Sequence, residues 1–571
     1  MNDIRRTILW VIFGISMVML WDQWQVYNGR KATFFPSPTP TTTPTTSNAP
    51  PATGVPAPVA ASSAGAVPGV PVVSGTATAP IAATPHERFE VSTDVFKLTF
   101  DTEGGSLVRS EFLRHADKGG NVVLLDDSKD RVYVAQTGVI GAGANGGFPT
   151  HKTVMTASGA RSLKDSEDQL VLTFTSPEVG GIKLVKTYTL RRGAYDIAVK
   201  HEVTNVSGAP LSPQLYLQLV RDGNKPEGES AFYSTFTGPA VYTAAKKYQK
   251  IEFADIKKKK ADYESQATDG YIAMVQHYFL SAWLLPEGLA RSIALDGVDI
   301  GSGVADCCYR ATTITTLETV APGASKSIEA KLFVGPQQET LLESLSPGLE
   351  LVKDYGWLTI IAKPLYWLLD KLHSVILNWG WAIVALVFLL KLAFYWLNEK
   401  AYASMAKMKA INPKIMEMRE RLKDNPQQMQ QEMMRIYREE KVNPMGGCFP
   451  IMIQIPVFIA LYWVLLSSVE MRGAPWALWI HDLSAPDPYY VLPLVMTLTT
   501  LLQTALNPAP PDPMQAKMMW IMPLMFSVMF FFFPSGLVLY WITNNVLSIA
   551  QMWVINTRMG VPPQFNLPKF K

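Results

Sequence analysis

The run WGWAIVALVFLLKLAFYWL occupies residues 379–397 and contains a single charged residue, Lys391. A helix needs about 20 consecutive apolar residues to cross the hydrocarbon core of a membrane, so a run of this length predicts a transmembrane helix. Four further apolar runs follow, at residues 449–469, 489–506, 518–533 and 536–556. The C-terminal part of the chain is therefore expected to form a core of five transmembrane helices.

The N-terminus predicts a sixth span. Residues 1–25 hold Arg5 and Arg6, then an apolar stretch that no cleavage site follows, which is typical of an uncleaved signal anchor. Residues 26–85 are rich in Pro, Thr and Ala and carry no charge from Ala32 onward. Such a composition cannot form a core, so we expect an extended linker.

The overall composition excludes several classes of protein. The chain has 571 residues, of which 48% are hydrophobic and 17% are charged, whereas soluble proteins average about 25% charged residues. The net charge of +3 implies no general affinity for nucleic acid. Cys307 and Cys308 are adjacent and Cys448 is remote. Because neighbouring cysteines seldom bridge, we expect no disulfide framework.

Residues 86–345, named here the β domain, alternate apolar and polar side chains. Ile197, Val199 and Val203 alternate with polar or small residues, and a second run alternates Ile328, Ala330, Leu332 and Val334 with Glu329, Lys331 and Phe333. A period of two predicts half-buried strands, and frequent glycine pairs mark turns. We expect one large β-sandwich. Residues 346–378 follow and predict an amphipathic helix lying along a membrane surface.

The distribution of basic residues predicts the topology. The connector 398–448 has ten Lys or Arg, whereas the connector 470–488 has only Arg472. Basic connectors stay in the cytoplasm. We therefore expect residues 398–448, the loop 507–517, the tail 557–571 and the N-terminus to be cytoplasmic, and the β domain and the loop 470–488 to be periplasmic. The protein would then be a multi-pass protein of a bacterial inner membrane.

Polar residues within the predicted spans lie mostly in their cytoplasmic halves. Lys391 would lie roughly 9 Å from the cytoplasmic end of its span at 1.5 Å per residue. A charge there is costly and marks a functional site by default. The bias predicts a hydrophilic groove that is open to the cytoplasm and closed to the periplasm. An alternative is that Lys391 only snorkels to the interface. The expected groove residues are Lys391, Gln454, Thr499, Thr500, Gln503, Ser527, Asn544, Asn545, Ser548 and Gln551.

The connector 398–448 predicts a helical hairpin that turns at residues 424–426, with Pro426 at the first position of its second helix. Its methionines and basic residues are expected to contact client chains or the ribosome. The alternative is that the methionines pack against one another. The residues expected to make these contacts are Met405, Met408, Lys409, Met429, Met433 and Arg435.

Four motifs stand out in the C-terminal part of the chain: Met405-Ala-Lys-Met408, Lys441-Val-Asn-Pro-Met-Gly-Gly-Cys-Phe-Pro450, Trp479-Ile-His-Asp-Leu-Ser484 and Phe533-Pro-Ser-Gly-Leu-Val-Leu-Tyr540. They resemble the YidC/Oxa/Alb family of membrane-protein insertases, in its Gram-negative form with a large periplasmic domain. The resemblance implies that the β domain is an all-β supersandwich of the galactose-mutarotase type. The resemblance implies a groove with one positive charge. The family usually has Arg where this chain has Lys391, and lysine keeps the charge without the two-pronged geometry. Trp541 stands where a second Tyr is usual.

The resemblance also implies a function without covalent chemistry, cofactor or metal. Nascent inner-membrane proteins would enter the groove, either with this protein alone or with the Sec translocon (SecYEG and SecDF), after delivery by the ribosome to the hairpin. Lipids would be further partners, and DNA would not. Client segments would slide into the lipid along Ile455, Pro456, Met525, Phe526, Tyr540 and Trp541.

Three other functions compete with this interpretation. A Sec-dependent chaperone would not insert clients alone, and a transporter or channel would need polar lining along its whole length. An enzymatic β domain would need an assembled site. Its histidines show no metal-ligand spacing; they are His115, His151, His201 and His277.

Overall fold

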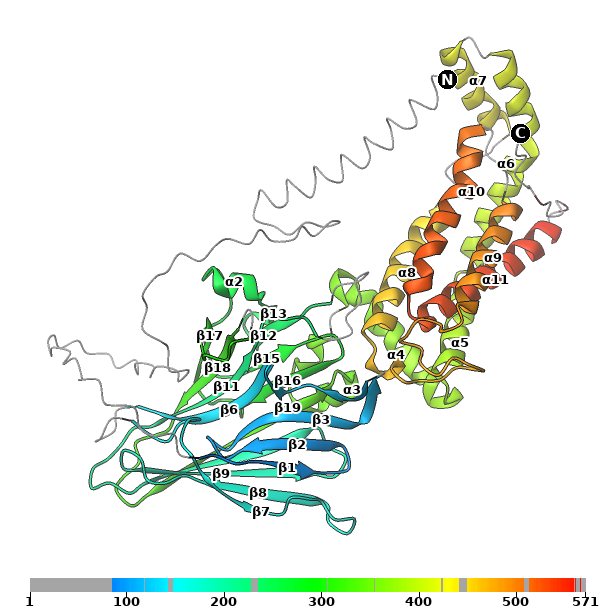
Figure 1. The fold of residues 1–571 in the computed structure, drawn as a ribbon. Helices are drawn as coiled ribbons and strands as arrows, with labels where there is room; N and C mark the ends of the chain where they lie inside the picture. Colours follow the sequence, from blue (N-terminus) through cyan, green and yellow to red (C-terminus); the bar gives the residue numbers. More distant parts are fainter. Residues whose placement is uncertain are drawn as a thin grey trace. The chain divides into compact units, whose positions relative to one another are not determined.

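The computed structural model of the chain is drawn in Figure 1. It describes residues 85–117, 119–141, 147–226, 235–304, 307–353, 355–422, 425–440, 449–507, 513–558, 560 and 565. The predicted signal anchor and nearly all of the predicted linker lie outside these residues.

The first sheet of the β domain has ten strands. These are β1 (Arg88–Ser92), β2 (Phe96–Asp101), β3 (Ser106–Asp117), β4 (Gly120–Val123), β5 (Asp126–Asp127), β6 (Val132–Ile140), β11 (Gln214–Arg221), β14 (Gln266–Ala267), β17 (Arg291–Gly297) and β18 (Tyr309–Thr316). Their order is β1-β2-β3-β6-β11-β18-β17-β14, with β4 on β3 and β5 on β6.

The second sheet has nine strands. These are β7 (Thr156–Gly159), β8 (Gln169–Thr175), β9 (Ile182–Arg191), β10 (Asp196–Asn205), β12 (Gly238–Thr243), β13 (Lys247–Lys250), β15 (Tyr271–Val275), β16 (Phe279–Leu284) and β19 (Ser325–Pro336). Their order is β13-β12-β15-β16-β19-β10-β9-β8-β7. A short helix, α2 (Phe253–Lys257), lies between β13 and β14 in the chain.

The two sheets share one apolar core, and the alternation predicted for β10 is confirmed. Ile197, Val199 and Val203 are completely buried, whereas Lys200 between them is exposed. The prediction was wrong for Phe333, which is also completely buried. Every residue from Leu332 to Pro336 is buried, so the end of β19 is covered on both faces and alternation stops there.

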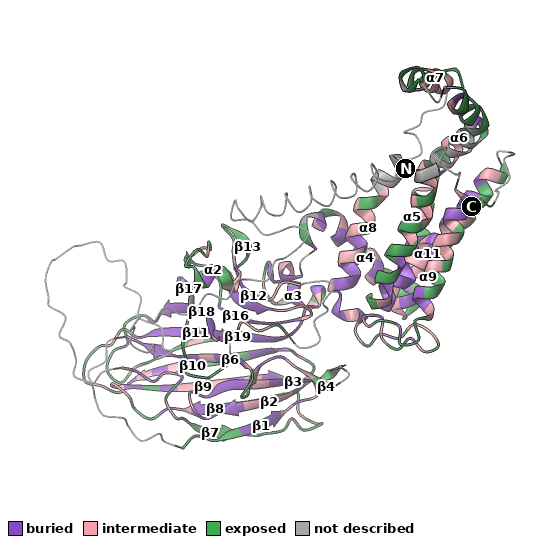
Figure 2. Cartoon of the chain, turned by 45° about the horizontal axis from the view of Figure 1, so that its top comes forward, coloured by how far each residue is buried: buried purple, intermediate pink, exposed green. Residues whose placement is uncertain are grey.

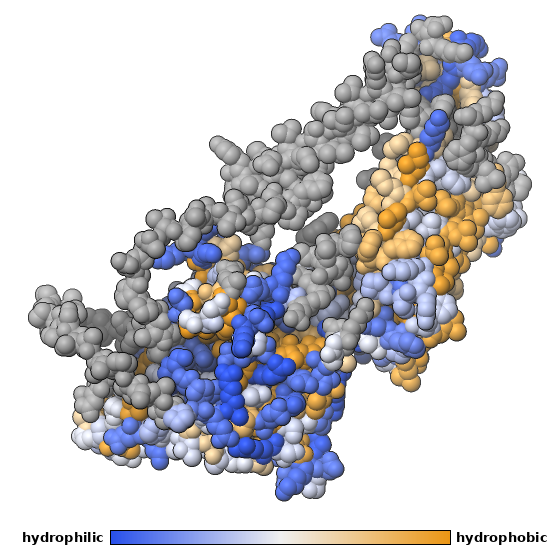
Figure 3. All heavy atoms as spheres, in the orientation of Figure 1, coloured by the Kyte–Doolittle hydropathy of each residue, from blue (hydrophilic) through white to orange (hydrophobic). Residues whose placement is uncertain are grey.

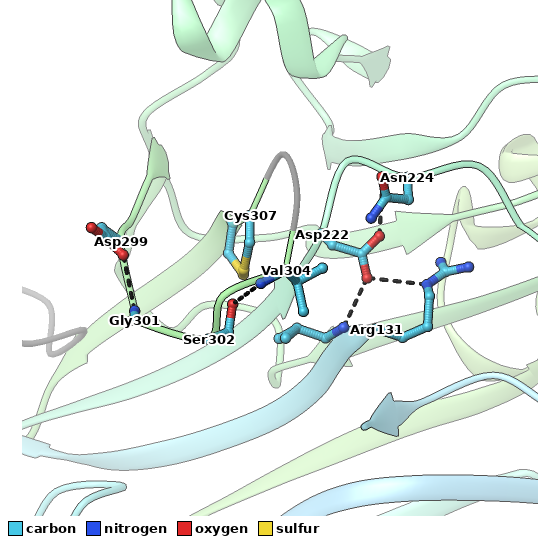
Figure 4. Close-up of a disulfide and its surroundings, with 10 residues drawn as sticks. Arg131, Asp222, Asn224, Asp299, Gly301, Ser302, Val304 and Cys307 are labelled. Carbon is cyan, nitrogen blue, oxygen red and sulfur yellow. Dashed lines mark hydrogen bonds and ion pairs between the residues drawn. A yellow bond between two sulfur atoms is a disulfide. The ribbon is translucent and has the colours of Figure 1, made fainter. Parts of the chain in front are cut away.

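Cys307 and Cys308 form a disulfide, although neighbouring cysteines seldom bridge. Because the two residues are adjacent, this bridge links no distant parts of the chain. Cys308 is anchored by two backbone hydrogen bonds to Val298, of 2.8 and 2.9 Å. The bridge lies beside the ion pair of Arg131 with the buried Asp222, as Figure 4 shows.

The rest of the described chain, from Glu339 to Arg558, is mostly helical. Its α-helices are α3 (Glu339–Leu345), α4 (Thr359–Ile376), α5 (Trp379–Ala393), α6 (Tyr395–Arg421), α7 (Pro426–Glu439), α8 (Phe449–Ser467), α9 (Val491–Leu506), α10 (Pro513–Ser527) and α11 (Ser535–Arg558). Short 3-10 helices cover Leu349–Val352 (η1), Gly356–Leu358 (η2), Val469–Met471 (η3) and Val528–Phe532 (η4).

Two of these helices follow directly from their sequences. On α4, Ala362, Leu365, Tyr366 and Leu369 recur at helical spacing and form its buried face. Pro426 begins α7 as predicted, and the Asn425 side chain accepts a hydrogen bond from the amide of Gln428. An asparagine in this position satisfies a backbone donor that the first turn leaves open.

The outer surface of the helices is strongly apolar. On the face drawn in Figure 3, hydrophobic residues gather over the helices, whereas the β domain is mostly hydrophilic. Figure 2 shows exposed residues on the outer sides of α5, α9 and α11. Large side chains such as Leu498 and Met525 are 67% and 63% exposed. A surface of this kind fits a lipid environment.

In the described part of the chain, α11 is the helix that by itself has the length and hydropathy to cross a membrane. A second candidate combines α5 with the start of α6, across a bend of 61° at Phe394. The apolar helical stretches Gln454–Ser467, Val491–Leu506 and Ala516–Phe532 are shorter. The arrangement with six spans therefore stays a prediction, and the run 379–397 is not one straight helix.

Candidate functional site

The site is built on one face of α11. Asn544, Ser548 and Gln551 are four and three residues apart, which places their side chains on the same side of a helix. Ser548 and Gln551 are buried and Asn544 is half-buried. Because α11 is otherwise largely apolar, this stripe needs polar partners from neighbouring helices.

Lys391 is the charged partner. It lies near the end of α5, and its Nζ donates a hydrogen bond of 2.8 Å to Oγ of Ser548. The Ser548 hydroxyl itself donates to the backbone oxygen of Asn544 at 2.6 Å. Its oxygen is thus oriented to accept from the lysine, and the ammonium group is held half-buried among the helices.

Two pairs of amide side chains complete the stripe. Gln454 on α8 donates through Nε2 to Oδ1 of Asn544 at 3.2 Å. At the other end, Asn398 on α6 donates through Nδ2 to Oε1 of Gln551 at 3.0 Å. The stripe on α11 therefore binds three different helices through three consecutive polar contacts.

Four of these residues line a cavity with about 440 Å³ of empty space, part of which is open to solvent. Its lining combines apolar side chains with the polar groups of Lys391, Asn398, Gln454 and Asn544. The lining residues are Val387, Leu390, Lys391, Phe394, Leu397, Asn398, Gln454, Val457, Tyr540 and Asn544. None of them is acidic, so among the lining residues the positive charge of Lys391 has no carboxylate opposite it.

The other predicted groove residues lie apart from this cavity. Asn545 donates to Oγ1 of Thr500 at 2.8 Å and of Thr499 at 3.3 Å, and so joins α11 to α9 on another side. Ser527 donates to the backbone oxygen of Pro523 within α10. Gln503 lies on α9 and is half-buried. The structure thus brings together five of the ten predicted residues: Lys391, Gln454, Asn544, Ser548 and Gln551.

Asn398 is part of the site but was not predicted. The apolar run ends at Leu397, so the sequence assigns Asn398 to the connector. In the structure Asn398 follows the bend at Phe394, is buried and contacts Gln551 of α11. A polar residue directly after an apolar run is a weak signal, because most such residues face water.

The chain matches two family models and several named proteins. Residues 88–368 match the family model described as YidC periplasmic domain, and residues 371–561 match the one described as 60Kd inner membrane protein. A membrane protein insertase YidC from Ralstonia nicotianae is 53% identical over 98% of both chains. One from Burkholderia multivorans is 50% identical over 98% of this chain and 99% of its own.

The chain belongs to the YidC family. Its relatives are inner-membrane proteins, and their named activity, membrane protein insertion, is not enzymatic. Among solved structures, an active YidC insertase crystal structure covers 81% of this chain and 91% of its own, with 20% identity and a TM-score of 0.38. A galactose mutarotase related enzyme from Lactobacillus acidophilus covers 44% of this chain and 97% of its own, with 8% identity and a TM-score of 0.30.

The residues expected to guide clients into lipid are partly exposed on the helices of this YidC-family chain. Ile455, Met525 and Phe526 are 48%, 63% and 49% exposed. Tyr540 is buried and lines the cavity, whereas Trp541 packs edge-on against the rings of Phe458 and Phe530. Pro456 is half-buried within α8. Their role in sliding stays a prediction.

The hairpin formed by α6 and α7 has an apolar seam. Met429 and Met433 pack against a buried cluster made by Ile411, Ile415 and Met418. Arg435 is exposed and pairs with Glu439 at 2.7 Å. For these two methionines, packing within the hairpin is observed. The side chains of Met405, Met408 and Lys409 lie outside the described residues, and client or ribosome contact stays a prediction.

Proposed function

We propose that this protein inserts nascent membrane proteins into a bacterial inner membrane through the cavity beside α11. The observation that carries the proposal is the position of Lys391, whose ammonium group contacts Ser548 and faces a cavity without acidic lining. A charge at such a site is costly to keep and is a functional-site hypothesis by default. It would attract the acidic or polar segment of a client that approaches from the cytoplasm.

The client's own apolar segment would supply the driving energy. Its polar tail enters the cavity, while its apolar part leaves past α8 and α10 into lipid along Ile455, Met525 and their neighbours. The membrane potential contributes about 2.3 kcal/mol per charge per 100 mV. This mechanism needs no nucleotide and no covalent intermediate.

The proposal includes the predicted topology and partners. The basic connector and both termini would be cytoplasmic, the β domain periplasmic, and six spans would cross the membrane. The basic residues of the hairpin would receive clients from the ribosome, and larger clients would be handled together with the Sec translocon. The contrast of ten basic residues in one connector with one in the next supports this orientation.

The test is insertion of a short client with an acidic tail into liposomes that contain only this protein. Wild type, Lys391→Arg, Lys391→Ala and Lys391→Glu are compared by protease protection of the client. We expect wild type and Arg to insert, Ala to be slower, and Glu to block, because a like charge repels the tail. Equal insertion by all four would reduce Lys391 to a snorkelling residue.

The same experiment distinguishes the proposed insertase from the main competing function, a Sec-dependent chaperone. A Sec-dependent chaperone would insert nothing above the level of empty liposomes, and adding the Sec translocon would restore insertion. A matched control is Ser535→Ala at the other end of α11, which loses a buried hydrogen bond of 2.8 Å to Ala485 without touching the cavity. We expect this variant to insert like wild type.

A further inference from the structure

Three polar contacts follow one another along α11, and we call the set the polar ladder. Its three rungs are the contacts Gln454–Asn544, Lys391–Ser548 and Asn398–Gln551. One side of the ladder is a single helix, and the other side is made by α8, α5 and α6 in turn. Because each rung joins α11 to a different helix, movement of one of these helices relative to α11 would open one rung and leave the other two closed.

The spacing of the rungs matches an extended peptide. Rung positions on α11 are four and three residues apart, which corresponds to about 6 Å and about 4.5 Å along the helix axis. The whole ladder thus covers about 10 Å, and an extended chain rises about 3.3 Å per residue. Three residues of an extended client segment therefore reach from the first rung to the last.

The chemistry of the outer rungs matches the peptide backbone. Both are pairs of neutral amides, Gln454 with Asn544 and Asn398 with Gln551. Each amide has a donor and an acceptor, as a peptide group has. Inside a membrane, an unpaired peptide group costs several kcal/mol. A client peptide group inserted into an open rung can accept from the donating amide, Gln454 or Asn398, and donate its N–H to the oxygen of the other, Asn544 or Gln551, so that neither amide loses a hydrogen bond.

We propose that the polar ladder binds the polar segment of a client as an extended strand, with the two amide rungs pairing with its backbone and Lys391 with its charge. This inference rests on the proposed insertase function and adds a second recognition element to it. The charge selects acidic side chains, whereas the amide rungs accept any sequence that has backbone N–H groups. Asn398 becomes a client-binding residue that sequence patterns did not reveal.

The test removes whole rungs. In Asn398→Leu/Gln551→Leu and in Gln454→Leu/Asn544→Leu, both partners become apolar, so no buried polar group is left without a partner. Each variant is reconstituted alone in liposomes with two versions of one short client, whose tails carry Asp or Asn at the same positions. Insertion rates are measured by protease protection.

We expect each double variant to slow the Asp tail and the Asn tail to the same extent, by about five-fold for the loss of one net hydrogen bond to the client. Lys391→Met is expected to slow the Asp tail more than the Asn tail. If a double variant slows only the Asp tail, the amide rungs act through the charge and the inference fails.

A third client distinguishes binding from a structural role. Its tail has proline at every second position, which removes those backbone N–H groups. Wild type should insert it more slowly than the Asn tail, and the double variants should slow it little further. If the double variants slow insertion of the proline tail and the Asn tail to the same extent, the rungs have only a structural role and the inference is overturned. If wild type inserts none of the three clients, the insertase function itself fails, which is a different result.

Discussion

Single buried residues decide how this chain responds to pH, and Lys186 is the clearest case. It lies on the inner face of β9, and its Nζ donates to the backbone oxygens of Gly104 at 2.6 Å and Thr137 at 2.7 Å. Burial lowers the pKa of Lys186 from 10.5 to about 7. Two carbonyl groups accept from its amino group, but no carboxylate contributes to this shift.

This lowered pKa predicts that the β domain becomes more stable as pH rises from 7 to 9. The unfolded chain binds a proton at Lys186 up to about pH 10.5, whereas the folded chain releases it near pH 7. The free energy of unfolding therefore increases as the pH rises, by at most about 1.4 kcal/mol per pH unit from this group. Lys186→Met should remove the slope.

The measurement is hydrogen exchange of β9 amides in the full chain in detergent, corrected for the intrinsic pH dependence of exchange. Lys183→Met on the same strand is the control, because Lys183 is exposed. An unchanged slope in Lys186→Met, or a changed slope in Lys183→Met, would contradict the prediction.

Among the elements, α4 depends on a buried ion pair for its position. Lys353 after η1 lies 3.3 Å from the carboxylate of Glu470 in η3, and its side chain is completely buried. Tyr366 on α4 donates to the same carboxylate at 2.7 Å, and the lysine ammonium lies 3.8 Å from its ring centre. The three groups tie together η1, α4 and the segment that follows α8.

We expect Lys353→Met to destabilise the helical part by about 3–5 kcal/mol, because it leaves the Glu470 carboxylate buried without its cation. Lys353→Met/Glu470→Gln should recover part of that loss, since the second change removes the uncompensated charge. Thermal unfolding in detergent measures both variants.

The control for this pair is Lys363→Met. Lys363 is 34% exposed and lies 3.9 Å from Glu339 and 4.0 Å from Glu350. Its contacts are longer than the 3.3 Å contact of Lys353, and its side chain is partly exposed whereas that of Lys353 is completely buried, so we expect a smaller loss of stability than in Lys353→Met. A loss in Lys353→Met no larger than in Lys363→Met would show that the buried pair does not hold α4.

At the scale of the whole molecule, the distribution of charge predicts which connectors face which side of the membrane. The connector 398–448, which contains the hairpin of α6 and α7, carries ten Lys or Arg, whereas the connector between α8 and α9 carries Arg472. Because basic connectors are retained on the cytoplasmic side, these two connectors should lie on opposite sides.

This orientation can be tested with cysteine labelling in a background without native cysteines. Gln430 on α7 and His481 between η3 and α9 are both exposed. A membrane-impermeant maleimide should label His481→Cys in intact spheroplasts, and Gln430→Cys only after permeabilisation. Labelling of Gln430→Cys in intact cells would invert the proposed topology.

Periodicity and charge along the chain were enough to predict its two-part organisation. Strands such as β10 alternate regularly because one face packs on the core, and apolar runs such as the one around Lys391 mark helices in a lipid environment. Five of the polar residues that meet on this face of α11 could be predicted, because polar side chains are costly in an apolar run. These patterns depend only on residues that are close in the sequence, so they can be recognised without knowledge of the fold.

The pairing of these residues depended on tertiary contacts. Asn544 and Asn545 are neighbours in sequence, yet they face α8 and α9 respectively, because successive residues of a helix point about 100° apart. Asn398 lines the cavity from the start of α6, just after the bend at Phe394, and its contact is with Gln551 of α11. The sequence gives the position of a residue along its helix. Which neighbouring helix its side chain contacts depends on how the helices pack.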